Sequence, residues 1–270
     1  MSVVAWATLA GGATPARAAM SLIRDAEIEN TIHDLAAPLL RAADLDADAL
    51  KVHLVNDPRL NAFVSSGMNL FLNTGLLMRA EDPAEVMGVM AHEFGHITGG
   101  HIILREQQLE ATQRNLWLSY ALGLAAALAS GRGEAFGGVM LGTQSGLIEN
   151  LMAFSRSEES QADQAGLEYL DDIGVSAAGL LKFMRILQGQ ELLVTARQDP
   201  YMRTHPLSRD RVVFIENHVK NSKIPADTLP QEWKDAYARL RAKLFGFLEP
   251  PARTLQRYPE TDTGIAARYA

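Results

Sequence analysis

The 270-residue chain has no cysteine. This absence excludes disulfide bonds, thiolate metal ligands and cysteine nucleophiles together. Any metal ion that the chain binds must therefore be held by histidine and carboxylate side chains.

Basic residues are also in the minority. The sequence has 25 Lys and Arg against 32 Asp and Glu, which gives a formal net charge of −7, and it contains no basic stripe. Because nucleic-acid binding needs a basic face, we expect no nucleic-acid partner. With 47% hydrophobic residues, the chain can bury a substantial core in one large domain, or in one domain with an appendage.

No apolar run is long enough to cross a membrane without interruption. Leu116 to Ala129 falls short of the roughly 20 residues that a spanning helix needs, and the stretch that follows contains Gln144 and Glu149. Glycines at four-residue spacing in that stretch permit close helix packing, both in membranes and in water. We expect residues 116–154 to form a mobile apolar hairpin or lid over a cleft, with membrane insertion as the alternative.

The first eighteen residues are typical of a secretory signal. Val3 to Ala10 is apolar, Pro15 follows, and Ala16-Arg17-Ala18 fits a cleavage site. We predict a signal peptide over residues 1–18 and export to the periplasm. The positively charged n-region is missing, as it would be if the true start lay upstream of Met1. A frayed, Ala-rich terminus is the alternative interpretation.

The strongest chemical signal is His92-Glu93-Phe94-Gly95-His96, a His-Glu-x-x-His motif. Asp82, Pro83 and Glu85 have the arrangement of a capping box, so a helix is predicted to begin near Pro83 and to carry the motif. On that helix the two histidines lie one turn apart on the same face and can reach one metal ion, with Glu93 beside them as a base. Apolar residues on the other side predict that the helix is buried on two sides.

The remaining patterns predict a mainly helical α+β fold. Apolar residues recur at three- and four-residue steps from Ser21 to Leu40, whereas Lys51–Val55 and Met68–Leu72 alternate as strands do. We expect these strands to form a small antiparallel sheet beside the motif helix. Further helices are predicted from Ser155 onward, from Ser176 to about Gln190, from Arg209 to Val219 and from Gln231 to Leu248, with a loop beginning at Asp199.

A catalytic zinc ion needs a third protein ligand, and three residues compete for that role. Glu158, Glu159 and His101 are the candidates. Glu159 is favoured because Asp163, one turn further on, could accept a hydrogen bond from a ligand histidine and fix its tautomer. The alternative is that these acidic residues form a solvated face of their helix.

Three motifs in this order resemble those of the M48 family of zinc metallopeptidases. They are the His92–His96 motif, then Ser155-Arg156 with Glu159 and Ala162-Asp163, then Thr204-His205-Pro206 with Arg211. The resemblance runs from about Ile28 to Val219 and is closest to the soluble, exported, BepA-like bacterial branch. It implies a zincin-like metalloprotease domain over residues 19–222. Residues 223–270 would form a helical extension, the start of a truncated region of tetratricopeptide repeats, because soluble members often continue into such repeats.

The resemblance also implies a role for each site residue. One Zn2+ per chain would be held by His92, His96 and Glu159, with Glu93 as general base and Asp163 orienting a ligand. His205 would approach the metal from the far side, as an oxyanion stabiliser or as a latch on the fourth position. Without the resemblance, His205 before Pro206 is a turn residue in an extended loop.

These roles predict an endopeptidase that cleaves unfolded or misassembled proteins in the cell envelope. Polypeptide substrates are expected to bind as an added strand along the Met68–Leu72 edge. The protein could make peripheral contact with a membrane or with outer-membrane assembly machinery, and the sequence leaves its oligomeric state open. The alternative is an assembly chaperone or adaptor with a latched zinc site, and a small-molecule hydrolase is disfavoured because no small-ligand motif is present.

Overall fold

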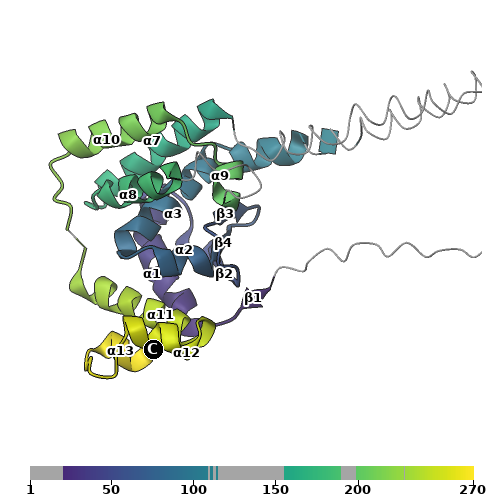
Figure 1. The fold of residues 1–270 in the computed structure, drawn as a ribbon. Coiled ribbons are helices and arrows are strands. Elements are labelled where there is room, and N and C mark those ends of the chain that lie inside the picture. The colour runs from purple at the N-terminus through teal and green to yellow at the C-terminus, as the bar shows by residue number, and fades with distance from the viewer. Residues whose placement is uncertain (1–20, 109, 112–113, 115–154, 190–198, 228) are drawn as a thin grey trace, which may run out of the picture.

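A computed structural model of the chain describes residues 21–108, 110–111, 114, 155–189, 199–227 and 229–270. It confirms the mainly helical α+β class, with helices packed beside a small four-stranded sheet (Figure 1). The predictions for residues 1–18 and 116–154 concern segments outside the described residues. Within the described part, no helix combines the length and the apolar character needed to cross a bilayer. The elements are β1 (Leu22–Ile23), α1 (Ala26–Ala42), β2 (Lys51–Val55), β3 (Ala62–Ser65), β4 (Asn69–Asn73), α2 (Thr74–Arg79), α3 (Pro83–Thr98), α7 (Arg156–Asp172), α8 (Ala178–Gln188), α9 (Pro200–Thr204), α10 (Arg209–Asn221), α11 (Gln231–Leu248), α12 (Pro251–Arg257) and α13 (Ile265–Tyr269).

The sheet is mixed, and the prediction of an antiparallel sheet is wrong for its central pair. The strand order is β1-β2-β4-β3, with β2 parallel to β4 and the other pairs antiparallel. The reason is that β3 intervenes in the chain and turns back into β4 through Gly67 and Met68, both at positive φ. After these two reversals β4 runs in the same direction as β2.

The same topology corrects the prediction about the substrate edge. The β4 strand, which contains most of the Met68–Leu72 stretch, lies between β2 and β3 and is hydrogen-bonded on both sides. It therefore offers no free edge to a peptide. The outer strands of the sheet are β1 and β3, and β3 is the one that packs against α3.

The first helix begins later than predicted. Asp25 caps α1 by accepting hydrogen bonds from the backbone of Glu27 and Ile28, so the helix cannot extend back to Ser21. Leu22 and Ile23 instead form β1, which pairs with the end of β2. Periodicity alone could not separate these two apolar residues from the helix that follows.

The motif helix α3 begins where the sequence predicts. Asp82 caps it, Pro83 is its first residue and Glu85 completes the capping box. Every residue from Pro83 to His96 is buried, which confirms burial on both sides. The helix ends at Thr98, and residues 101–108 are helical again beyond Gly100, which has a φ of +69°.

Close packing of α3 against α7 depends on two glycines. A Cβ atom on Gly95 would lie 2.7 Å from the Ala162 carbonyl oxygen, and one on Gly166 would lie 3.0 Å from the backbone nitrogen of His92. Side chains at either position would push the helices apart. The missing side chains therefore let α7 bring its acidic residues against the motif.

The C-terminal helix α11 has the predicted bounds and packs on α1 and α2. The Tyr237 hydroxyl donates a hydrogen bond to the Leu77 carbonyl oxygen at 2.9 Å, and an Arg241 guanidinium nitrogen donates to the Met78 carbonyl oxygen at 3.0 Å. Both acceptors lie near the end of α2, where a helix leaves carbonyl groups without intrahelical partners.

Candidate metal centre

The two motif histidines face each other inside the molecule. His92 and His96 are at most 1% exposed, and their Nε2 atoms lie 3.1 Å apart. This confirms the placement expected for two side chains one turn apart on a helix. Two imidazole nitrogens at this distance define one side of a small polar centre.

Glu159 joins them from α7. Its Oε1 atom is 3.3 Å from His96 Nε2, and its Oε2 atom is 3.6 Å from His92 Nε2. The other two candidates have different roles. Glu158 completes the cap of α7 by accepting a hydrogen bond from the Ser155 backbone at 2.7 Å, and His101 lies behind His96, with 2.9 Å between their Nδ1 atoms.

The partners of the histidine Nδ1 atoms determine which way the lone pairs point. Asp163 Oδ1 lies 2.8 Å from His92 Nδ1, so the imidazole proton lies on that side and Nε2 is left to face the centre. For His96, burial lowers the pKa to about 2, so this ring is neutral. When a metal ion replaces the proton on His92 Nε2, the centre offers it two nitrogen lone pairs and a carboxylate.

The electrostatics of the centre favour a cation. Burial lowers the pKa of His92, but the hydrogen bonds and charges of Asp163 and Glu159 outweigh burial and raise it to about 9. The pKa of Glu159 is well below its ordinary value: burial raises it, and the surrounding histidines more than compensate. Positive charge between these carboxylates is therefore stabilising.

Arg211, from α10, supports the centre from behind. It makes two hydrogen bonds to Asp163, at 2.6 and 2.8 Å, and an ion pair with Glu159. It also donates to the Pro206 carbonyl oxygen at 3.0 Å, directly after His205. The sequence placed Arg211 in a motif but gave no indication of this role, because a bidentate contact between two helices leaves no local pattern.

His205 lies inside the centre, among the candidate ligand atoms of His92, His96 and Glu159. It follows the short helix α9, which replaces the predicted loop, and it is 1% exposed. Its Nδ1 atom lies 3.0 Å from Glu159 Oε1, and its Nε2 atom lies 3.6 Å from Glu93 Oε1. The Tyr201 ring stacks on the imidazole with centroids 4.4 Å apart.

The start of α9 is tied to the segment before β3. The Leu60 backbone N–H donates to the Asp199 side chain at 3.1 Å, and the Tyr201 backbone N–H donates to the Leu60 carbonyl oxygen at 3.4 Å. The backbone N–H and carbonyl groups of Leu60 thus both hold the start of α9, the helix that precedes His205.

Glu93 has the environment of a proton carrier. Its Oε1 atom is buried and accepts no hydrogen bond from the described residues. Burial, opposed by the charges of His205 and His92, raises the pKa of this carboxyl above its ordinary value of 4.5. A carboxyl with a raised pKa gains and releases a proton closer to neutral pH.

These residues fit a zinc ion. The candidate ligand atoms of His92, His96, Glu159 and His205 all lie within 4.8 Å of one another. Ligands about 2.05 Å from a tetrahedral zinc are about 3.3 Å apart, and the first three residues give separations of 3.1, 3.3 and 3.6 Å. A set of two histidines and one glutamate is a known catalytic zinc set.

The sequence that forms this centre also matches a known protein family. The model of peptidase family M48 matches residues 23–219, which include all the residues of the centre. The chain belongs to peptidase family M48. The resemblance drawn from the three motifs is thereby confirmed.

Three relatives illustrate the range of M48 proteins that are similar to this chain. The beta-barrel assembly-enhancing protease of Yersinia pestis is 25% identical over 224 residues, which are 83% of this chain and 46% of that protein. The Escherichia coli K12 protein of the same name is 26% identical over 201 residues, 74% of this chain and 41% of that protein. Metalloprotease LoiP of Escherichia coli K12 is 29% identical over 170 residues, 63% of this chain and 62% of that protein. The chain thus spans less than half the length of the two assembly-enhancing proteases.

Proposed function

We propose that this chain is a zinc-dependent endopeptidase in which His92, His96 and Glu159 hold the metal. The separations of 3.1 to 3.6 Å between their ligand atoms carry the proposal, because they match a tetrahedral zinc site. Membership of M48 supports the assignment. Asp163 and Arg211 keep the ligands oriented.

Glu93 acts as the general base. When bound, zinc supplies a Lewis acid that makes a water molecule acidic and polarises the carbonyl of the scissile peptide. Glu93 removes a proton from the attacking water at its Oε1 atom, and it later delivers that proton to the nitrogen of the leaving amine. The C–O bond thus forms before the C–N bond breaks, and the carboxylate is regenerated.

Polypeptide substrates bind as an added strand on β3. The outer edge of β3 is free of strand partners in the described sheet, and β3 packs against the motif helix. An extended peptide there would hydrogen-bond through its backbone, which gives little side-chain selectivity. Weak selectivity of this kind suits the removal of unfolded or misassembled proteins in the periplasm. The names of the two beta-barrel assembly-enhancing relatives support a role close to beta-barrel assembly.

A second function, as an assembly chaperone or adaptor, is supported by the position of His205. This side chain already lies among the ligand atoms and is 1% exposed, so it can fill the fourth position on the metal and exclude water. In that case client binding would persist while proteolysis stayed low. The two functions differ in whether removal of His205 increases cleavage.

One experiment tests the proposal and separates these functions. Zinc content and casein cleavage are measured for the wild type, for Glu93→Gln and for His205→Ala. Glu93→Gln should keep its zinc and lose cleavage by a factor of at least about 100. Wild-type cleavage by Glu93→Gln would refute the role of the base, and zinc-free wild-type protein would refute the metal site. If the wild type cleaves casein negligibly and His205→Ala cleaves it faster, the chaperone with a latched zinc site is favoured.

A further inference from the structure

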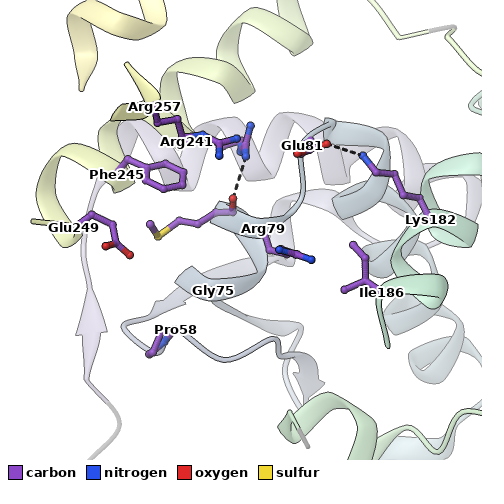
Figure 2. A pocket seen from close by; sticks show the side chains of 11 residues that line it. Pro58, Gly75, Arg79, Glu81, Lys182, Ile186, Arg241, Phe245, Glu249 and Arg257 are labelled. Carbon is purple, nitrogen blue, oxygen red and sulfur yellow. Dashed lines mark hydrogen bonds and ion pairs between the residues drawn. The ribbon is translucent and has the colours of Figure 1, made fainter. Parts of the chain in front are cut away.

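A cavity lies away from the metal centre, between the C-terminal helices and the body of the protein. It has a volume of about 460 Å3, and its walls come from α11 and α12 on one side and from α2 and α8 on the other (Figure 2). The family match ends at residue 219, so α11 and α12 lie outside it. The lining residues are Pro58, Gly75, Met78, Arg79, Glu81, Lys182, Ile186, Arg241, Phe245, Glu249 and Arg257.

The charge of this cavity is opposite to that of the chain. Its lining has four basic residues against two acidic ones, although the whole chain carries a formal charge of −7. The two carboxylates already have cationic partners: Glu81 is bound by Lys182 at 3.1 Å, and Glu249 is bound by Arg253 at 3.1 Å. The other basic residues of the lining, Arg79, Arg241 and Arg257, make no ion pair with the described residues.

Arg241 is the most informative of these arginines. It is only 8% exposed, and its Nε atom has no hydrogen-bond partner among the described residues. One terminal nitrogen donates to the Met78 carbonyl oxygen, which is a neutral acceptor. Glu81 acts on Arg241 only through its charge, without an ion-pair contact, and is itself bound by Lys182. A buried guanidinium in this state is costly unless an anion pairs with it.

Two further arginines provide more donors around the same space. Arg79 ends α2, and Arg257 lies over the Phe245 ring, with its guanidinium carbon 4.8 Å from the ring centroid. Figure 2 shows Arg79 on α2, and Arg241 and Arg257 on the helices of the other wall. Guanidinium groups bind carboxylates through two parallel hydrogen bonds, so arginines that line one cavity can hold a carboxylate that enters it.

The rest of the lining is apolar and limits what the ligand can be. Ile186, Phe245 and the Met78 side chain border the space next to the arginines. Inorganic phosphate would leave these surfaces without a partner. The net charge of −7 disfavours approach to an anionic bilayer. A cavity of this size is in the lower half of the usual range for ligand pockets, about 300 to 1,000 Å3, and so suits the end of a chain.

We propose that this cavity binds the C-terminal carboxylate of a polypeptide whose last side chain is apolar. The carboxylate pairs with Arg241 and with Arg79 or Arg257, and the last side chain packs against Phe245 and Ile186. This site is separate from the metal centre. It does not depend on the proposed peptidase activity, because binding alone defines it.

Fluorescence anisotropy with a labelled octapeptide that ends in leucine tests the proposal. The full chain carrying Glu93→Gln is used so that bound peptide stays intact. The peptide with a free C-terminus should bind at least about tenfold more tightly than the same peptide with an amidated C-terminus. Equal affinities would overturn the proposal, as would tight binding of inorganic phosphate or of anionic vesicles without this preference.

Two exposed arginines allow the site to be located without disturbing the core. Arg79→Gln should weaken binding of the free acid about fivefold or more, and Arg79→Gln with Arg257→Gln should reduce the preference for the free acid to the part that Arg241 alone provides. Arg41→Gln removes one charge from the exposed end of α1 and is the matched control, which should bind as the parent does. A preference that is unchanged in the double variant would place the carboxylate elsewhere, for example on the zinc, and would overturn the assignment.

Discussion

Gly95→Ala tests whether close contact of α3 and α7 sets the geometry of the metal centre. The new methyl group would lie 2.7 Å from the Ala162 carbonyl oxygen and 2.9 Å from the Ala162 Cα, both in backbone that cannot rotate away. Ordinary contacts begin at 3.4 Å, so α7 must retreat by the difference from 2.7 Å, which is about 0.7 Å. Glu159 precedes Ala162 by one turn of the same helix and must move with it.

A displacement of this size matters more to the metal than to the fold. Ligand distances in zinc sites are held to within about 0.2 Å, so we expect zinc affinity to fall by about tenfold to 100-fold. Overpacking of a helix interface costs about 1 to 3 kcal/mol of unfolding free energy. Zinc affinity is measured by competition with a chromogenic chelator, and stability by urea unfolding in the presence of excess chelator.

Gly189→Ala provides the control for Gly95→Ala. Gly189 caps α8 at negative φ, and the nearest atom to its added Cβ, outside its own neighbours, is the Ile186 carbonyl oxygen at an ordinary 3.4 Å. This variant should keep wild-type zinc affinity and change stability by less than about 0.5 kcal/mol. Zinc affinity that is the same in Gly95→Ala and in the wild type would refute the argument that helix contact positions Glu159.

Three further predictions concern groups around the site and the C-terminal helix. Arg211→Gln removes one of the two buried cations that face Asp163 and Glu159, and leaves only His92 there. Urea unfolding should therefore show a loss of up to about 3 to 5 kcal/mol, partly restored by added zinc. Tyr237→Phe removes the donor to the Leu77 carbonyl oxygen and should cost about 1 to 3 kcal/mol in the same assay; an unchanged midpoint would show that water replaces the hydroxyl. The pKa of Asp163 is lowered from 3.8, because hydrogen bonds from Arg211 and His92 outweigh the effect of burial. Its stabilising contribution is therefore present above the unfolded-state pKa and lost as pH falls below roughly 4, and Asp163→Asn should flatten this acid limb of the pH–stability curve.

Local signals in the sequence predicted the parts of the site that lie on single helices. The cap at Asp82 fixes the start of α3, and helical spacing then places His92 next to His96. The same spacing on α7 predicted that Asp163 follows Glu159 on one face, and the structure brings both to the histidines. Each of these features is decided within a few residues of chain.

Features that depend on distant partners could not be read in the same way. The parallel pairing of β2 with β4 depends on where β3 inserts, and β1 is too short to show alternation. The role of Arg211 arises only when α10 packs beside α7. Its side chain reaches Asp163 across 48 positions of sequence, a contact that no local pattern encodes.

The two hydrogen bonds of Leu60 give the molecule a mechanical property. They connect the segment before β3 to the first residues of α9, and His205 directly follows the other end of α9. The β3 strand, on which a substrate peptide is proposed to bind, and the His205 imidazole, which is proposed to fill the fourth position on the metal, are therefore both tied to Leu60. A shift of Leu60 would therefore be expected to move the proposed substrate strand and His205 together.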